Sequence, residues 1–464
     1  MVKGGSTMIE RTIREITEMI SVENDVTQIA DIQITGVCID TRKIEKGNLF
    51  IPFKGENTDG HRFAAQAIEA GASAVLWQKD VPLPEENFPV IVVEHTLDAL
   101  QSLASSYRQQ LQAKIVAITG SNGKTTTKDI AASVISQQYR VHKTDGNFNN
   151  HIGMPLTILG MSADTEVGIV EMGMSGFGEI ELLTKIAQPD YALITNIGEA
   201  HMEDLGSREG IATAKFEIVK GLKVNGVLIF PEEEPLLQGK LSTISQVKTC
   251  TFGFKTAADY YPAHIEMNEE GTYFTVPALD EQSFYLSIPG KHNIANALAV
   301  LAVAKCLDMD NDAIRQGLKE IALSNMRMEW NEGYKGAKIL NDAYNSSPTA
   351  TRAVISMVEN FSSAYNKILV LGDMLELGDQ TMEYHREIGE SIDSEKVKYV
   401  FTYGELSKYI ALGATKNFPK ENVFHFLNQD ELVDAIKQKI TGNEIILIKA
   451  SRGMKMEQTV EALK

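Results

Sequence analysis

Short apolar runs alternate with longer segments of helical spacing along most of this sequence. Three runs rich in β-branched and aliphatic residues, KIVAIT (114–119), VGIVEMGMSG (167–176) and YALITNIGEAH (191–201), are typical of buried strands. Residues 125–139, TTTKDIAASVISQQY, place their apolar positions three and four apart, as an amphipathic helix does. Repeated units of this kind predict an α/β protein with parallel sheets.

The same alternation divides the 464 residues into three predicted domains, in keeping with about 150 residues for a typical domain. Residues 1–112 mix strands, helices and polar loops and indicate an N-terminal α/β domain. Residues 113–325 predict a central parallel-sheet domain, in which period-2 alternation over residues 247–288 favours a small antiparallel addition. Residues 326–464 repeat strand and helix and predict a Rossmann-like domain, with ligands at the carboxyl ends of its strands.

A phosphate-binding turn is predicted between the strand at 114–119 and the helix that follows it. Gly120 and Gly123 permit a tight turn, Lys124 can reach the outer phosphates, and Thr125 can bind Mg²⁺. The usual P-loop has a glycine six residues before the lysine, where this chain has Ile118, so the motif is the short form TGSNGKTT. An ordinary turn between strand and helix is the alternative. We expect ATP, bound by Gly120, Ser121, Asn122, Gly123, Lys124, Thr125 and Thr126.

Charged side chains follow the next strands at the sheet edge where this turn lies. Glu171 ends one strand and suits Mg²⁺ beside Thr125, although a lone glutamate at a strand end is often a surface residue. His201 closes the polar tip of the strand after it. Lys215 lies in a predicted helix that Ser207 caps, and on its own it is interpreted as part of a solvated face.

Two loops are dense in hydrogen-bonding groups. One follows a predicted strand and carries Thr41, Arg42, Asp59, Gly60 and His61, and the other carries Asn147, Asn149, Asn150 and His151. Loops of this composition often bind ligands. For the first loop, the alternative is a solvated surface loop with one satisfied histidine. For the second, the alternative is a capped turn before a helix that starts near Pro155.

Polar side chains also begin a helix at residues 289–307, where Asn293 and Asn296 lie one turn apart on one face and can contact a base edge. In the third domain, polar residues again gather where predicted strands end. They are Asp342, Tyr344, Asn345, Ser346, Asp373, Glu376, Lys449, Ser451 and Arg452.

Composition narrows the class of protein. Forty-four basic and 62 acidic residues give a net charge of −18, which argues against a DNA or RNA partner. No apolar run approaches the 18 to 20 residues, roughly, of a membrane span, and the first residues lack the apolar segment of a signal peptide. Cys38, Cys250 and Cys306 are widely spaced and favour buried thiols over a disulfide framework or a zinc site. We therefore expect a soluble cytoplasmic protein.

Together these motifs resemble the Mur ligases, over essentially all three predicted domains. TGSNGKTTTK, EMGMSG, TNIGEAH, ATAKFEI, GKHNIANA and RMEW resemble motifs of that superfamily. GENTDGHRF, GNFNNHIGMPLT, NDAYNSSPTA, LGDMLELG and KASRGMKME resemble the branch that adds D-alanyl-D-alanine to UDP-N-acetylmuramoyl-tripeptide in peptidoglycan synthesis. The resemblance implies that ATP phosphorylates the tripeptide carboxylate, and that the dipeptide amine then attacks the acyl phosphate.

The resemblance also implies roles for residues. Lys124, Glu171, His201 and Lys215 would be catalytic, with Lys215 carbamylated and with two Mg²⁺ ions near Thr125, Glu171, His201 and Lys215. Asn293 and Asn296 would face adenine, Arg327 the outer phosphates and Asp342 the ribose. Thr41, Arg42, Asp59, Gly60 and His61 would hold the uridine nucleotide. Asn147, Asn149 and Asn150 would hold the sugar and diphosphate, and Asn345, Ser346 and Arg452 the dipeptide.

Two other functions remain open from the sequence. A folylpolyglutamate-type ligase resembles the same central domain, and a P-loop switch protein would use nucleotide to control partners. The DTR and DGH segments favour the UDP-sugar substrate, and Glu171, His201 and Lys215 favour chemistry over switching. Substrates held by three domains imply domain closure, because an acyl phosphate exposed to water would hydrolyse. We expect a monomer.

Overall fold

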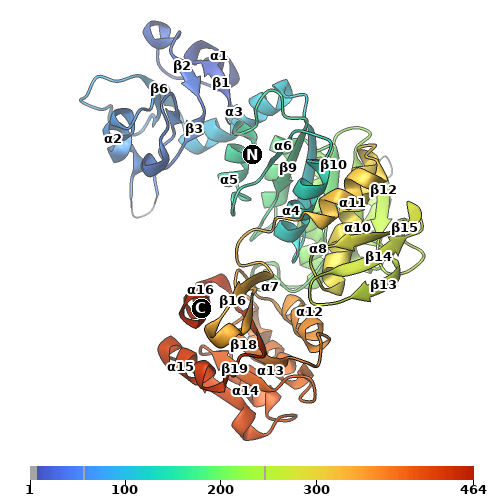
Figure 1. Ribbon diagram of the computed structural model, residues 1–464. Helices are drawn as coiled ribbons and strands as arrows, with labels where there is room; N and C mark the ends of the chain where they lie inside the picture. The colour runs from blue at the N-terminus through green and yellow to red at the C-terminus, as the bar shows by residue number, and fades with distance from the viewer. Residues whose placement is uncertain (1–7, 56–57, 245–246) are drawn as a thin grey trace.

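The computed structural model describes residues 8–55, 58–244 and 247–464, and it has three α/β units in chain order (Figure 1). Residues 1–7, on which part of the signal-peptide argument rests, and residues 56 and 57 of the GENTDGHRF motif lie outside the described residues. The predicted fold class is confirmed: parallel sheets dominate all three units. In the described part of the chain, no helix is long and apolar enough to cross a membrane.

The first unit contains a two-stranded antiparallel sheet and a four-stranded parallel sheet in the order β3-β4-β5-β6. The sequence ITGVCID (34–40) is strand-like, but Gly36 adopts φ 85° and separates β2 from β3 within it. Helix α3 (Thr96–Gln110) leads from this unit to the central one. The strands are β1 (Glu10–Thr12), β2 (Gln33–Thr35), β3 (Val37–Cys38), β4 (Leu49–Phe50), β5 (Ala74–Gln78) and β6 (Val90–Val93).

The central unit is built on a six-stranded parallel sheet in the order β12-β11-β10-β7-β9-β8. Beside it lies a three-stranded antiparallel sheet, β13-β14-β15. The strands are β7 (Lys114–Thr119), β8 (Val141–Lys143), β9 (Val167–Glu171), β10 (Tyr191–Ile194), β11 (Val227–Pro231), β12 (Lys248–Phe252), β13 (Ala263–Met267), β14 (Thr272–Val276) and β15 (Asp280–Leu286).

The antiparallel prediction for residues 247–288 is wrong for its first strand. β12 pairs in parallel with β11 and forms the edge of the main sheet, whereas β13, β14 and β15 are antiparallel as predicted. An edge strand is partly solvated, so its polar and apolar residues can alternate even in a parallel sheet. Here the period-2 alternation therefore reflected the partial exposure of β12 and did not indicate the direction of the strand.

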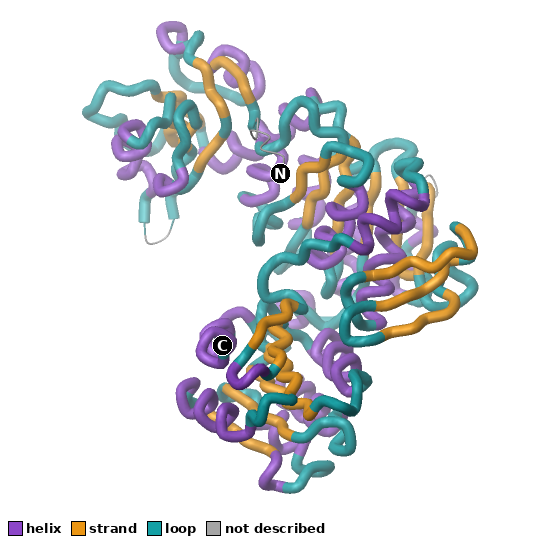
Figure 2. The backbone as a smooth tube through the Cα atoms, in the orientation of Figure 1, coloured by secondary structure: helices purple, strands orange, loops and turns teal. Residues whose placement is uncertain are grey.

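Alternate side chains of the central strands enter two different cores. Val116, Ile118 and Leu193 pack with α4, α10 and α11 on one face, while Ile115, Ala117 and their neighbours pack with α3, α5 and α6 on the other. The sheet therefore lies between two helical layers, which explains why its strands read as continuous apolar runs. The residues that follow β7 contact the third unit, so the carboxyl ends of the strands face that unit, which lies below the central one in Figure 2.

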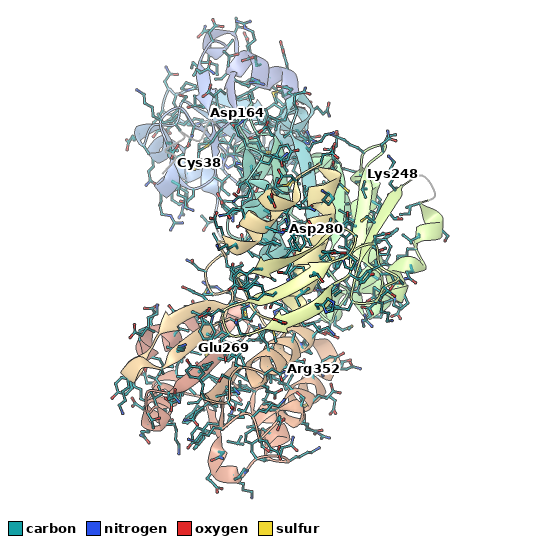
Figure 3. The ribbon with its side chains drawn as sticks, turned by 45° about the vertical axis from the view of Figure 1, so that its right-hand side comes forward. Cys38, Asp164, Lys248, Glu269, Asp280 and Arg352 are labelled. Carbon is teal, nitrogen blue, oxygen red and sulfur yellow. The ribbon has the colours of Figure 1, made fainter. Side chains whose placement is uncertain are left out.

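The third unit is a six-stranded sheet in the order β16-β17-β21-β18-β19-β20, parallel except for β16. The hairpin between β13 and β14 contacts it, where Glu269 accepts a hydrogen bond from the Ser362 backbone N–H (Figure 3). The strands are β16 (Glu329–Glu332), β17 (Lys338–Asn341), β18 (Asn366–Gly372), β19 (Tyr399–Tyr403), β20 (Val423–Phe426) and β21 (Glu444–Lys449).

Helices cover the sheets in all three units, and the three cysteines are free and partly buried. The helices other than α3 are α1 (Ile13–Met19), α2 (Ala64–Glu69), α4 (Lys124–Ile135), α5 (Gly153–Leu159), α6 (Glu179–Ala187), α7 (Met202–Leu205), α8 (Arg208–Phe216), α9 (Pro235–Gln238), α10 (Lys291–Cys306), α11 (Asn311–Lys319), α12 (Pro348–Glu359), α13 (Thr381–Ser391), α14 (Lys408–Ala414), α15 (Gln429–Lys439) and α16 (Glu457–Leu463).

Candidate functional site

The turn between β7 and α4 has the geometry of a phosphate-binding loop. Gly120 and Gly123 adopt φ angles of 148° and 80°, which only glycine takes without strain. A Cβ atom on Gly120 would lie 1.8 Å from Thr195 Oγ1, and one on Gly123 would lie 2.7 Å from Asn296 Oδ1. α4 begins at Lys124 with no side chain capping its first turn, so its N–H groups remain available to an anion.

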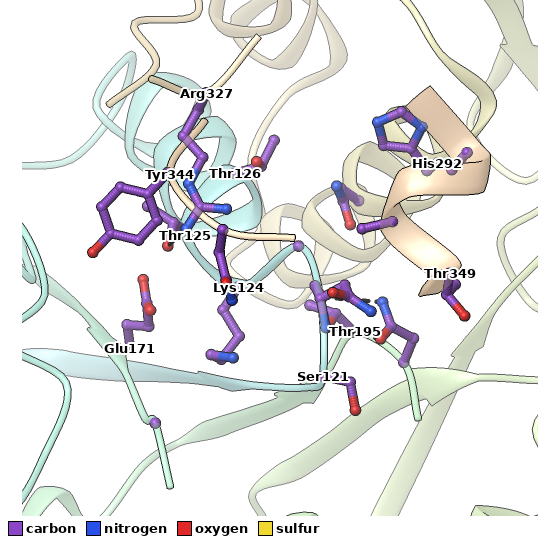
Figure 4. Close-up of a pocket in the computed structure, with 18 of the residues that line it drawn as sticks. Ser121, Lys124, Thr125, Thr126, Glu171, Thr195, His292, Arg327, Tyr344 and Thr349 are labelled. Atoms are coloured by element: carbon purple, nitrogen blue, oxygen red, sulfur yellow. Dashed lines mark hydrogen bonds between the residues drawn. The ribbon is translucent and has the colours of Figure 1, made fainter. Parts of the chain in front are cut away.

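Lys124 lies at the bottom of this turn, partly buried. Its ammonium donates a 2.7 Å hydrogen bond to the Gly120 carbonyl, which bends the side chain back over the loop (Figure 4). Burial lowers the pKa of Lys124, Glu171 opposes that shift, and Arg327 adds to it. An anionic ligand would reverse the shift by stabilising the charged amine.

Glu171, at the end of β9, is 3% exposed, and its two carboxylate oxygens differ. Oε1 accepts a 2.8 Å hydrogen bond from Asn149 Nδ2, whereas Oε2 is buried without a partner among the described residues. A buried carboxylate oxygen that accepts no hydrogen bond favours a cation next to it. The Thr125 hydroxyl, at the start of α4, accepts a 3.1 Å bond from Arg327 Nη2.

His201 and Lys215 add basic groups beside Lys124. His201 has a φ of 64°, and its Nδ1 lies 3.3 Å from Glu376 Oε2 of the third unit. Burial, and then the charges of Lys124 and Lys215, lower the pKa of His201 to about 4. We infer that its imidazole is neutral at physiological pH and can act as a ligand or acceptor.

Lys215 is 1% exposed, so its interpretation as a solvated face is wrong. Burial, and then the charge of Lys124, lower its pKa well below the ordinary value for a lysine. No carboxylate of the described residues forms an ion pair or hydrogen bond with its amine. A buried lysine without a counter-ion is unusual in a folded protein.

Asn293 and Asn296 lie on the first two turns of α10, where the sequence places them on one face. They are 1% and 7% exposed, and Asn296 Nδ2 donates a 3.3 Å bond to Asn293 Oδ1. Asn293 Nδ2 is already bonded to the Pro289 carbonyl at 2.7 Å, so Asn296 retains more free hydrogen-bonding capacity than Asn293.

The third unit contributes cations around the ring of Tyr344. The guanidinium carbons of Arg327 and Arg452 lie 4.2 Å and 5.9 Å from the centre of that ring, and Figure 4 shows Arg327 and Tyr344 beside Thr125. At the ends of β17 and β21, Asp342 Oδ2 and Lys449 Nζ form a buried ion pair of 2.5 Å. Strand ends thus collect charge here, as the topology predicts.

A cavity of about 740 Å³ lies between the central and third units and collects most of the predicted residues. Tyr344 and Lys449, from the polar strand ends of the third unit, also line it, as do Thr195 and Asn196, for which the sequence predicted no role. From the predicted set, the lining residues are Ser121, Asn122, Gly123, Lys124, Thr125, Thr126, Asn147, Asn149, Asn150, Glu171, His201, Asn293, Asn296, Arg327, Asp342, Asn345 and Arg452.

Among the described residues of the predicted set, three close to this cavity do not line it. Gly120 is the first residue of the phosphate loop, Lys215 is buried in α8, and the buried Ser346 exchanges a 2.8 Å hydrogen bond with Thr351 Oγ1. The next residue, Ser347, reaches the loop instead and donates to Asn122 Oδ1 at 2.8 Å. Ser346 and Ser347 are adjacent in a polar run, and nothing in the sequence indicates which of them contacts the loop.

The predicted residues of the first unit are outside this cavity, and Arg42, Asp59 and His61 have partners within that unit. Arg42 forms two hydrogen bonds to Asp40, of 2.9 and 2.8 Å, and these hold the pKa of that carboxyl down to about 2. His61 is 3% exposed, and its Nδ1 lies 2.6 Å from Asp59 Oδ1. Its Nε2 accepts a 3.1 Å bond from the Gln78 backbone N–H. Both ring nitrogens of His61 are therefore occupied within the domain, and Thr41 and Gly60 lie on the same loops.

Profiles of one protein family match most of the chain. The Mur ligase family, catalytic domain, matches residues 33–108, the Mur ligase middle domain matches residues 118–304, and the Mur ligase, glutamate ligase domain, matches residues 326–452. The UDP-N-acetylmuramoyl-tripeptide--D-alanyl-D-alanine ligase of Bacillus subtilis (strain 168) is 49% identical over 456 residues, which are 98% of this chain and 99% of that protein.

Solved structures give the same result at lower identity. MurF from Acinetobacter baumannii superposes with a TM-score of 0.89 at 28% identity, over 98% of this chain and 99% of that one. The MurF ligase from Thermotoga maritima in complex with ADP gives a TM-score of 0.81 at 28% identity, over 92% and 96% of the two chains. Similarity of this extent covers all three units.

Proposed function

Because this chain belongs to the Mur ligase family, we propose that it joins D-alanyl-D-alanine to UDP-N-acetylmuramoyl-tripeptide and converts ATP to ADP and phosphate. The product is the UDP-linked pentapeptide precursor of peptidoglycan. The observation that carries the proposal is the cavity between the central and third units, where an open helix N-terminus, Lys124 and the half-satisfied Glu171 converge. The D-alanyl-D-alanine ligase named above is similar along its whole length, which favours this substrate over a folate.

ATP would lie across this cavity. The backbone N–H groups of residues 123–126, at the start of α4, would surround its phosphates, with Lys124 and Arg327 offsetting their charge. Asn296, with the support of Asn293, would face adenine, and Asp342 would bind the ribose. Arg327 can serve because its Nε is buried without a partner among the described residues.

The residues present fit Mg²⁺ near the phosphate loop. Thr125 and the unpartnered Oε2 of Glu171 would hold one ion, and His201 would lie close to a second. No group of three or more His, Cys, Asp or Glu side chains in the described ranges is arranged for a metal, so phosphate oxygens and water would complete the coordination. Bound Mg²⁺ would offset negative charge on the transferring phosphoryl group.

Lys215 would be carbamylated. Its lowered pKa favours the neutral amine, which can add to CO₂ to give a carbamate with release of one proton. The change would place an anion beside Lys124, where a protonated Lys215 would be repelled, and would provide a negative group for the metal side of the site. The absence of a counter-ion for Lys215 among the described residues supports this proposal.

The remaining substrates would come from the two flanking units. Thr41, Arg42, Asp59, Gly60 and His61 would form the uridine-nucleotide site, with the Asp59 and His61 pair holding the loop in shape. The cavity residues Asn147, Asn149 and Asn150 would bind the sugar and diphosphate.

The dipeptide would lie against Asn345, Ser346 and Arg452. The Ser346 hydroxyl is already bonded to Thr351, and Arg452 Nη1 lies 3.3 Å from Glu457 Oε1, so the dipeptide would use Asn345 and the other guanidinium nitrogens of Arg452. Arg452 would pair with the terminal carboxylate of the dipeptide.

In the reaction, an oxygen of the tripeptide carboxylate attacks the γ-phosphorus of ATP, and ADP leaves. The dipeptide amine then attacks the acyl carbon, loses a proton, and expels phosphate. Lys124 and the loop amides stabilise charge on the transferred group in the first step. Because the first-unit residues lie outside the cavity, the units must approach one another, and closure would keep water from the acyl phosphate.

We assign the uridine-nucleotide role to residues 1–112, the ATP role to residues 113–325 and the dipeptide role to residues 326–464. We also propose that the protein is a monomer and works in the cytoplasm, where nucleotide substrates of this kind are made. Each substrate contact proposed above comes from a single chain.

The test is a coupled assay of ADP release with purified UDP-tripeptides that carry lysine or diaminopimelate at the third position. We expect release to require both the UDP-tripeptide and D-alanyl-D-alanine, and the two UDP-substrates to give different rates. A nucleotide switch would release ADP without the dipeptide, and a folylpolyglutamate-type ligase would require a folate and glutamate instead. Either result would overturn the proposal.

A further inference from the structure

The tip of the phosphate loop is fixed by the segment that follows β10. Asn196 contacts the backbone of Asn122 twice: its Oδ1 accepts from the Asn122 N–H at 3.0 Å, and its Nδ2 donates to the Asn122 carbonyl at 3.0 Å. Thr195 Oγ1 donates to the same carbonyl at 2.6 Å. The backbone of Asn122 is therefore held entirely from within the central unit.

The side chain of Asn122 is held differently. Its Oδ1 accepts the 2.8 Å hydrogen bond from Ser347 Oγ of the third unit, and its Nδ2 is buried without a partner among the described residues. Within the described chain, Ser347 is thus the hydrogen-bonding partner of this amide. The two residues are 225 positions apart in sequence, so the bond forms only when the third unit lies against the loop.

Ser347 is well placed for such a contact. It is 3% exposed and is the N-cap of α12, where its Oγ accepts from the Ala350 N–H at 3.4 Å while it donates to Asn122. Two residues on, Thr349 Oγ1 donates to Glu199 Oε2 at 2.6 Å, on the polar tip that follows β10. The start of α12 therefore contacts the phosphate loop and the tip of the neighbouring strand together.

We propose that Ser347 is a positioning residue for the reaction: through Asn122, docking of the third unit sets the shape of the phosphate loop. This inference rests on the function proposed above, because it assumes that the loop holds ATP. The Ser347 hydroxyl belongs to the third unit, where the dipeptide is placed. When that unit is docked, the hydroxyl therefore favours the productive shape of the phosphate loop. Ser347 acts through Asn122 and need not touch substrate itself.

The test is a double-mutant cycle on kcat/KM for ATP, with Ser347→Gly, Asn122→Ala and the double variant. Glycine is tolerated at an N-cap at small cost, and Asn122→Ala leaves the backbone contacts of Asn196 in place. Each single variant is expected to lower kcat/KM about tenfold, with little change in KM for the UDP-tripeptide. The kcat/KM of the double variant should also fall about tenfold, because both changes remove the same hydrogen bond.

Asp310→Ala is the matched control, since Asp310 caps α11 through the Ala313 N–H away from the cavity. It should lower Tm slightly and leave kcat/KM unchanged. A hundredfold loss in the double variant, or parental kinetics in Ser347→Gly, would overturn the inference. If the parental enzyme itself shows no ADP release that depends on the dipeptide, the proposed function fails instead, so the two failures are distinguishable.

Discussion

The cavity between the central and third units and the loops of the first unit both carry charged and polar side chains, but they differ in how those groups are satisfied. In the cavity, Glu171 Oε2 and Arg327 Nε are buried without partners among the described residues. In the first unit, Arg42 is paired with Asp40, and His61 uses both ring nitrogens within the domain.

Unused hydrogen-bonding capacity at buried atoms costs stability, so it persists where a ligand supplies the missing partner. The cavity thus has the character of a site arranged for phosphate and cation before they bind. The first-unit loops are stable by themselves, and a nucleotide there must exchange partners with existing pairs or use backbone groups. Substitutions in the two regions should therefore differ both in size and in kind.

The largest effect is expected from Lys124→Ala. Its ammonium offsets charge that develops as the phosphoryl group transfers, so kcat should fall about 10³-fold or more while the fold is kept. ADP release measures kcat, and circular dichroism melting shows whether the fold is kept. Lys185→Ala, which removes an exposed helical lysine paired with Glu181, is the control and should have parental activity. Near-normal turnover of Lys124→Ala would remove ATP from this loop.

Lys215→Ala should have the second largest effect, about 10²-fold on kcat, if the site requires the carbamate anion. Short carboxylic acids such as formate or acetate should then restore part of the activity, because they can place an anion in the vacated space. Lys215→Arg should be inactive and not rescued, since it fills the space with a fixed positive charge. Lys220→Ala, five residues on and exposed, is the control and should be neutral.

A rise in the activity of Lys220→Ala on addition of the same acids would mean that the acids act elsewhere. A bare amine at Lys215 in a crystal of the ATP and Mg²⁺ complex, together with normal activity of Lys215→Ala, would exclude the carbamate. Removal of CO₂ from the buffer gives an independent measurement, because parental activity should fall and should return on addition of bicarbonate.

The sequence predicted the parts of this site that local chain chemistry determines. The strand at 114–119 has the observed bounds of β7, and the glycine turn and Glu171 at a strand end follow from short-range pattern and parallel topology. The three-domain α/β fold follows from strand and helix alternation in the same way.

Side-chain burial and pairing could not be predicted, because they depend on segments distant in sequence. The helical pattern around Lys215 does not show that its amine is buried, and two successive serines do not show that Ser346 faces Thr351 while Ser347 faces the loop. His61 is a similar case: Gln78, which occupies its Nε2, is 17 residues away. For His61, the sequence left open the alternative of a satisfied histidine, and the observed hydrogen bonds favour that alternative.

Arg42 and His61 separate binding from stability within the first unit. Arg42→Ala should raise KM for the UDP-tripeptide about tenfold and leave KM for ATP unchanged, because an exposed guanidinium is lost in a domain apart from the ATP cavity. Arg14→Ala removes a comparable exposed pair, with Asp31, and should change neither constant. A rise in KM for ATP with Arg42→Ala would contradict the assignment of the first unit.

His61→Ala should instead lower the free energy of unfolding by about 2 kcal/mol, since it leaves the partly buried backbone N–H of Gln78 without its acceptor. Its effect on KM for the UDP-tripeptide would follow from the altered loop. Thermal melting compares Arg42→Ala with His61→Ala, and only His61→Ala should have a lower Tm than the parent. Equal Tm values would mean that His61 serves the ligand more than the loop.

The smallest effect is expected at Tyr344, whose ring lies beside both Arg327 and Arg452. A cation–π contact is worth about 1 kcal/mol, so Tyr344→Leu should lower kcat/KM about fivefold for ATP and for the dipeptide alike, because one ring orients both cations. Tyr344→Phe keeps the ring and should remain close to the parent, which separates the ring from the hydroxyl. If Tyr344→Leu affected ATP alone, the ring would serve Arg327 only, and the proposed link between the phosphate and dipeptide sides of the cavity would be lost. Steady-state kinetics with each substrate varied in turn decides between these outcomes.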